Sequence, residues 1–125
     1  MIKDPRPVTI FCDIDGTLVE HEAPFISCHP DYSMQLLEGT LEKLEEWDRA
    51  GYNIILTTGR RESMRTQTEK QLSKAGIIYD QLIMGIGGGK RCIINDRKPA
   101  GDRDYAYAIN LYRNQGVKDV QIWSY

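Results

Sequence analysis

The stretch Val8-Thr9-Ile10-Phe11-Cys12-Asp13-Ile14-Asp15-Gly16-Thr17-Leu18 decides how this chain folds. Its first five residues are mostly β-branched or aromatic and follow a segment with two prolines, which is typical of a buried strand. Acidic residues and a glycine come directly after this run. We therefore predict a central strand over residues 8–12 that ends in a loop carrying Asp13 and Asp15.

Helix and strand patterns alternate after this loop. Apolar side chains recur at helical spacing between Thr40, a suitable N-cap, and Gly51, a typical helix stop, which predicts a helix over residues 40–50. A polar helix is expected to end at Gly76. This polar helix covers residues 62–75. Residues 105–111 fit a strand or a helix, with the strand slightly favoured. The strand candidates after the first are residues 52–57, 81–84, 92–94 and 117–123.

This order of elements predicts the α/β class. Strands that alternate with helices form a parallel sheet with helices on its faces. We expect a three-layer Rossmann-like fold with a mainly parallel central sheet. We also expect a single domain over residues 1–125, since a chain of this length buries one core.

Charge and cysteine content narrow the class of function. The chain has 16 basic and 18 acidic residues and a net charge of −2, so no basic excess indicates a nucleic-acid partner. Its three cysteines are widely spaced and form no CxxC pair, which argues against disulfides and against a zinc site. We find no signal-peptide pattern and no apolar run of the ~20 residues that a membrane span needs. These features predict a cytoplasmic protein without a membrane segment.

Reactive side chains follow three of the predicted strands. Asp13 and Asp15 follow the first, Thr58 follows the second, and Asp96 follows the fourth. Because ligands bind at the carboxyl ends of the strands in an open α/β sheet, we expect these groups to converge. Clustered carboxylates repel one another and need a cation among them. A hard site of oxygen ligands favours Mg²⁺.

These residues resemble the four motifs of the haloacid dehalogenase (HAD) superfamily of phosphotransferases. The resemblance rests on the hydrophobic strand before Asp-x-Asp-Gly-Thr, on Thr58-Gly59-Arg60, on a later lysine and on Asp96, and it spans residues 8 to about 98. It implies a cap-less HAD core and a Mg²⁺-dependent phosphatase. Asp13 would be the nucleophile that forms an aspartyl-phosphate. Asp15 would protonate the leaving oxygen and then activate the hydrolytic water.

The resemblance also implies a metal site and a cationic partner for the phosphate. The Asp13 carboxylate, the Asp15 backbone carbonyl and the Asp96 carboxylate would bind Mg²⁺. The family often has two adjacent acids where this chain has Asn95 and Asp96. Lys90 is the favoured motif lysine, with Lys98 and Arg91 as alternatives.

The residues around the phosphate have their own expected roles. Gly16 permits the sharp turn that directs backbone N–H groups to a phosphate, and Thr17 belongs to the same expected phosphate-binding turn. Thr58 offers a hydroxyl and Gly59 an open N–H group. Arg60 fits a second anionic group of the substrate as well as it fits a solvated position at a helix start. Lys98 is a further substrate-binding candidate.

Spacing between the motifs leaves no room for a cap domain. An open crevice needs a large substrate, or a neighbouring subunit of a homo-oligomer that serves as a lid. We favour a small phosphorylated sugar or metabolite, and the alternative is the phosphorylated end of a polynucleotide. A non-catalytic receiver domain with a phosphoacceptor aspartate is a third interpretation, although its phosphorylated Asp would follow the third strand, where this chain has Met84 and Gly85.

Overall fold

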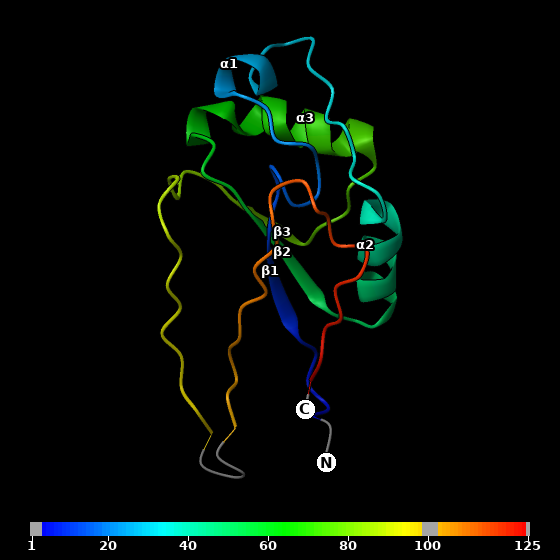
Figure 1. Ribbon diagram of the computed structural model, residues 1–125, viewed down its shortest axis with the longest axis vertical. Coiled ribbons are helices and arrows are strands. Elements are labelled where there is room, and N and C mark those ends of the chain that lie inside the picture. Colours follow the sequence, from blue (N-terminus) through cyan, green and yellow to red (C-terminus); the bar gives the residue numbers. More distant parts are fainter. Residues whose placement is uncertain (1–3, 99–102, 125) are drawn as a thin grey trace.

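The computed structural model describes residues 4–98 and 103–124. Within them, the parallel strands β1 (Thr9–Asp13), β2 (Asn53–Thr57) and β3 (Gln81–Ile83) form one sheet in the order β1-β2-β3. Helices α2 (Thr40–Arg49) and α3 (Arg65–Ala75) connect the strands (Figure 1). The α/β class and the parallel sheet are therefore confirmed.

Side-chain burial follows the pattern of the three strands. Every second residue of β1 is buried, whereas three consecutive residues of β2 are buried, as expected of a strand with neighbours on both sides. The core between the sheet and the helices contains Ile10, Leu44, Trp47, Ile54 and Leu56. β2 is thus the central strand. The prediction that the first strand is central was wrong for the described sheet, because β1 lies at its edge.

The two predicted helices are confirmed, with one change at the first N-terminus. Gly39 rather than Thr40 is the N-cap of α2, and its φ of 84° is a conformation that glycine adopts readily. Thr40 is the first helical residue, and its Oγ1 donates a 2.7 Å hydrogen bond to the Leu18 carbonyl. The short 3₁₀ helix η1 (Glu62–Met64) precedes α3, which ends at Gly76 as expected.

The later strand predictions were wrong for the described residues. Residues 92–94, 105–111 and 117–123 form no strand there. Side-chain contacts hold part of this region instead: the rings of Tyr107 and Trp123 stack at 3.7 Å, and the Tyr107 hydroxyl donates a 2.7 Å hydrogen bond to the Trp123 carbonyl. These contacts do not need the backbone ladder that defines a strand.

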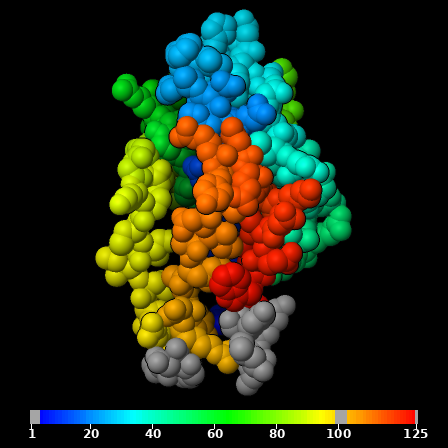
Figure 2. All heavy atoms as spheres, viewed as in Figure 1, coloured from blue at the N-terminus to red at the C-terminus, as the bar shows by residue number. Residues whose placement is uncertain are grey.

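The segment of residues 103–124 covers one face of the molecule. Figure 2 shows it in orange and red across the side turned to the viewer, beside the yellow segment of residues 85–98. Val117 in this segment is buried in the core. In the part of the chain that the structure describes, no helix has the length and apolar character needed to cross a membrane.

Candidate active site

The predicted convergence at the carboxyl ends of the strands holds for β1 and β2. Asp13, the last residue of β1, is paired in register with Thr57, and Thr57 is paired with Ile83 of β3. The three strands therefore end side by side. The segments that follow these strands carry Asp15, Thr58 and Met84, and all three start from the same end of the sheet.

Asp13 lies at this end of the sheet and is exposed to solvent. Protein atoms surround much of its carboxyl group, and this desolvation raises the pKa of Asp13 above its ordinary value. The Thr17 hydroxyl opposes the shift by donating a 3.1 Å hydrogen bond to Oδ2. The negative charge of Asp15 also raises the pKa of Asp13. The two carboxyl groups are thus close enough for the charge of one to act on the other.

A turn from the far end of the chain fixes the loop after Asp13. The Asn114 N–H donates a 2.8 Å hydrogen bond to the Gly16 carbonyl, and Asn114 Oδ1 accepts one of 2.8 Å from the His21 N–H. Asn114 has a φ of 64°, which asparagine tolerates better than most residues. Sequence reasoning missed this residue, although Asn-Gln-Gly at 114–116 is a recognisable turn signal.

The same loop shows that two expected phosphate contacts are used within the protein. The Gly16 N–H donates to the Val19 carbonyl at 2.8 Å, and the Thr17 hydroxyl points to Asp13. Gly16 has a φ of 87°, so the sharp turn itself is present as predicted. In this arrangement Gly16 and Thr17 shape the loop and position Asp13.

Thr58 and Gly59 lie against the start of the glycine run. The Thr58 hydroxyl is buried and accepts a 3.1 Å hydrogen bond from the Arg60 N–H, which leaves its proton for another acceptor. A Cβ placed on Gly59 would lie 2.6 Å from the Gly87 carbonyl oxygen. The Gly85 N–H donates to the Arg60 carbonyl at 2.7 Å. Only a residue without a side chain fits at Gly59.

The side chain of Arg60 is buried and binds Asp15. Its Nε donates to Asp15 Oδ2 at 3.0 Å and its Nη2 to Asp15 Oδ1 at 2.9 Å. The Arg60 side chain is 6% exposed and that of Asp15 is 21% exposed. The expectation that Arg60 binds substrate or stays solvated is therefore corrected, because the guanidinium faces Asp15 inside the protein.

The basic residues of the glycine run differ in their position. Arg91 folds back across this run, because its Nη1 and Nη2 donate to the carbonyls of Gly89 and Gly87 at 2.6 and 2.8 Å. Its positive charge lowers the pKa of Asp13. Lys90, the favoured motif lysine, is exposed beside it.

Asp96 and Lys98 are not brought to Asp13. The segment that contains them runs away from the carboxyl ends of the strands toward the lower end of the molecule in Figure 1. Lys98 Nζ lies 3.0 Å from Asp96 Oδ2, so the two charges pair with each other. Among residues 4–98 and 103–124, no group of three or more His, Cys, Asp and Glu side chains is placed to hold a metal ion.

The loop after the first motif is attached to α3. The short helix α1 (Pro24–Ser27) lies in this loop next to α3 (Figure 1). Gln67 Nε2 donates to the carbonyls of Cys28 and His29 at 2.7 and 2.9 Å. His29 and Cys28 therefore take part in this contact through their backbone.

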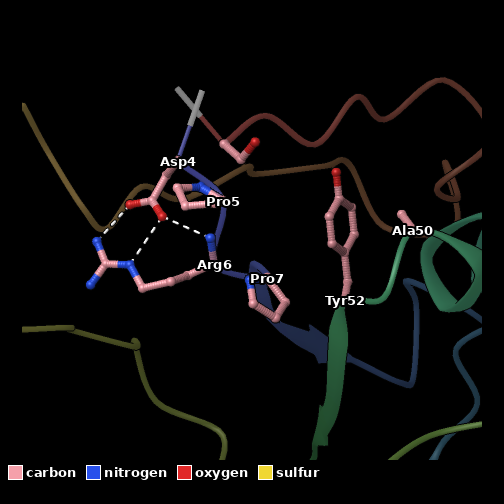
Figure 3. A pocket seen from close by; sticks show the side chains of 7 residues that line it. Asp4, Pro5, Arg6, Pro7, Ala50 and Tyr52 are labelled. Carbon is pink, nitrogen blue, oxygen red and sulfur yellow. Dashed lines mark hydrogen bonds and ion pairs between the residues drawn. The ribbon is translucent and has the colours of Figure 1, made fainter. Parts of the chain in front are cut away.

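A separate pocket lies at the opposite ends of the strands. It has a volume of about 350 Å³ and is lined by residues that precede β1 and β2 and by Ser124 (Figure 3). Asp4 and Arg6 in its wall form an ion pair of 2.6 Å. Because these charges neutralise each other and lie at the amino-terminal end of the sheet, the pocket takes no part in the arrangement around Asp13.

The structure thus combines a parallel α/β sheet with two acidic residues at the end of the first strand and a threonine after the second. The model of the haloacid dehalogenase-like hydrolase family matches residues 10–84, which carry these features. The chain belongs to this family and is a hydrolase. No curated protein matches the chain.

Several solved structures are similar to this one. A chain in a structure of the Pnkp1/Rnl/Hen1 complex has 28% identity over 74% of this chain and 33% of its own length, with a TM-score of 0.54. A chain in a structure of the Pnkp1/Rnl/Hen1 RNA repair complex has 30% identity over 67% of this chain and 28% of its own, with a TM-score of 0.52. This chain thus spans about a third of their length.

A third similar structure is that of D,D-heptose 1.7-bisphosphate phosphatase from B. bronchiseptica complexed with magnesium and phosphate. It has 19% identity over 65% of this chain and 51% of its own, with a TM-score of 0.46.

Proposed function

We propose that the protein hydrolyses phosphomonoesters through an aspartyl-phosphate on Asp13. The observation that carries this proposal is the position of Asp13. It ends β1, is open to solvent and has Asp15 two residues away in a loop that Asn114 fixes. Membership of the haloacid dehalogenase-like hydrolase family supports the same chemistry.

The proposed reaction has two displacements at phosphorus. A carboxylate oxygen of Asp13 attacks the phosphorus, the bond to the leaving oxygen breaks with its electron pair, and Asp15 gives that oxygen a proton. A water oxygen then attacks the aspartyl-phosphate while Asp15 takes up its proton. The bond between Asp13 and phosphorus breaks, which releases inorganic phosphate and restores both carboxyl groups.

We infer that Arg91 is the cation beside the reacting group. Two carbonyls of the glycine run hold its guanidinium, and its charge acts on the Asp13 carboxyl. A guanidinium can bind a phosphate through two hydrogen bonds. Lys90, the residue expected from the sequence, stays a second candidate for this role.

Mg²⁺ is the proposed cofactor. The Asp13 carboxylate and the Asp15 carbonyl would supply two oxygen ligands, and Mg²⁺ commonly takes one or two carboxylates and completes its shell with water. A bound Mg²⁺ would screen the charge of a phosphoryl group. Asp96 stays a predicted ligand that the structure places elsewhere.

A small phosphorylated sugar or metabolite is the proposed substrate. A net charge of −2 does not favour a long polyanion. The phosphorylated end of a polynucleotide is the second candidate, and the similarity to chains of RNA repair complexes favours it. Sugar phosphates and oligonucleotides with a terminal phosphate, tested side by side, separate the two.

The activity is tested with an aryl phosphate and added Mg²⁺. We expect release of inorganic phosphate, loss of release with EDTA and loss with Asp13→Asn. Asp119→Asn is the matched control, because it makes the same change at an exposed turn position outside the predicted motifs. Full activity of Asp13→Asn would contradict the proposed mechanism.

A further inference from the structure

Arg60 makes a buried connection between the loop after β1 and helix α3. Four of its five N–H groups donate within the protein: two to Asp15, and the two on Nη1 to Thr68 Oγ1 at 3.2 Å and to Gln71 Oε1 at 2.7 Å. Thr68 and Gln71 are themselves buried. They are three residues apart on α3 and so lie on the same face of the helix.

Gln71, which binds the Arg60 guanidinium, is itself held in place by a second hydrogen bond. Gln71 Nε2 donates a 2.9 Å hydrogen bond to the Ser27 carbonyl, which ties the side-chain amide at both ends. With its amide held in this way, Gln71 presents its oxygen to Arg60. α3 thereby holds the plane of the guanidinium, and the guanidinium holds the plane of the Asp15 carboxylate.

From this geometry we propose that Arg60 is a positioning residue that orients the Asp15 carboxyl for proton transfer, with Thr68 and Gln71 fixing its guanidinium. The proposal rests on the proposed function, because it assigns a purpose to Asp15 in that reaction. Each carboxylate oxygen bound by Arg60 keeps a second lone pair, and this can hold the proton that goes to the leaving oxygen.

A substrate-binding role for Arg60 conflicts with the same contacts. A substrate anion would have to replace Asp15 on the guanidinium. That replacement leaves a partly buried carboxylate without its partner, which is strongly unfavourable. Arg61, the next residue, is exposed and makes no ion pair within the described residues, so it offers a matched comparison.

The choice of leaving group separates positioning from binding. An alkyl alcohol is a poor leaving group and needs a proton from Asp15 as its bond to phosphorus breaks. A nitrophenol leaves as a stable anion and needs that proton far less. General acid catalysis contributes about 10²–10⁴-fold where it is needed. Loss of a residue that orients the acid therefore affects alkyl phosphates selectively.

The test compares kcat/KM for an alkyl phosphate and for p-nitrophenyl phosphate in Arg60→Gln, Arg61→Gln and the unchanged protein. For Arg60→Gln we expect a loss of about 10²-fold or more with the alkyl ester and of less than about 10-fold with the aryl ester. Arg61→Gln should keep both values within about 2-fold. Equal losses of kcat/KM for the two esters in Arg60→Gln would overturn the proposal.

A second variant covers the case in which Arg60→Gln does not fold. Thr68→Val keeps the shape of the side chain and removes one hydrogen bond to Arg60. We expect the same selectivity for the alkyl ester on a smaller scale, about 3- to 10-fold. A lower melting temperature with an unchanged ratio of the two kcat/KM values would mean that the contact between Thr68 and Arg60 only stabilises the fold. If the unchanged protein hydrolyses neither ester, the proposed function itself fails.

Discussion

Gly59 packs against the backbone of the glycine run, so a side chain at this position would meet the Gly87 carbonyl group. In Gly59→Ala the new Cβ would lie 2.6 Å from the Gly87 oxygen and 3.0 Å from its carbonyl carbon, whereas ordinary contact begins at 3.4 Å. Both neighbours are backbone atoms that cannot rotate away. The Gly87 carbonyl must therefore move, and with it the hydrogen bond that it accepts from Arg91.

Two magnitudes follow from this displacement. Overpacking of this kind costs typically about 1–3 kcal/mol in the free energy of unfolding, which corresponds to a loss of roughly 4 °C in melting temperature per kcal/mol. A misplacement of about 1 Å in a reacting site can cost about 10²-fold in rate. We expect Gly59→Ala to lower kcat/KM for an aryl phosphate by about one to two orders of magnitude.

Gly88→Ala is the control for this prediction. A Cβ on Gly88 meets no atom within 4 Å, and its backbone conformation suits other residues. Thermal unfolding and kcat/KM are measured for both variants. If Gly59→Ala matches Gly88→Ala in both quantities, the glycine run does not pack against Gly59 and the position argued for Arg91 is lost.

Three further predictions concern the core and the thiols. Leu56→Ala in the central strand should lower the free energy of unfolding by about 2–5 kcal/mol in urea, because Leu56 is fully buried. Thr40→Val should cost about 1 kcal/mol and Thr40→Ser much less, because the lost hydrogen bond to the Leu18 carbonyl needs only the hydroxyl. Burial raises the pKa of Cys12 to about 12, so this thiol should resist a disulfide reagent at pH 8 until the protein is denatured. The exposed Cys92 should react at once. Early reaction of Cys12 would contradict its burial.

The sequence predicts the half of the fold that local patterns determine. Apolar runs that end in glycine or acidic residues located all three strands of the described sheet to within one or two residues. Helical spacing and the stops at Gly51 and Gly76 located α2 and α3. Residues 105–111 fitted two periods at once, so their pattern carried little information. Their contacts are long-range, as between Tyr107 and Trp123.

For the site, the sequence indicated which residues carry chemistry better than how they are held. Asp13 ends β1, and Asp15 and Thr58 follow aligned strands, so their convergence could be predicted. The pairing of Arg60 with Asp15 could not, because 45 residues separate them and an arginine after a strand looks the same whether it faces solvent or a buried carboxylate. The weak signal was in α3, where Thr68 and Gln71 occupy buried positions that apolar residues would normally fill.

The attachment of α1 to α3 bears on which substrate the open site can use. Gln67 and Gln71 of α3 bind the backbone carbonyls of the loop after the first motif and so hold this loop against α3. Closure of this loop over Asp13 would break these hydrogen bonds. Exclusion of water then depends on the substrate itself or on a second copy of the chain. If the substrate excludes the water, kcat/KM should rise with the size of the alcohol in a series of alkyl phosphates with equal leaving-group acidity. If a second copy excludes it, kcat/KM should instead fall when the protein is diluted, and its mass in solution should fall with it.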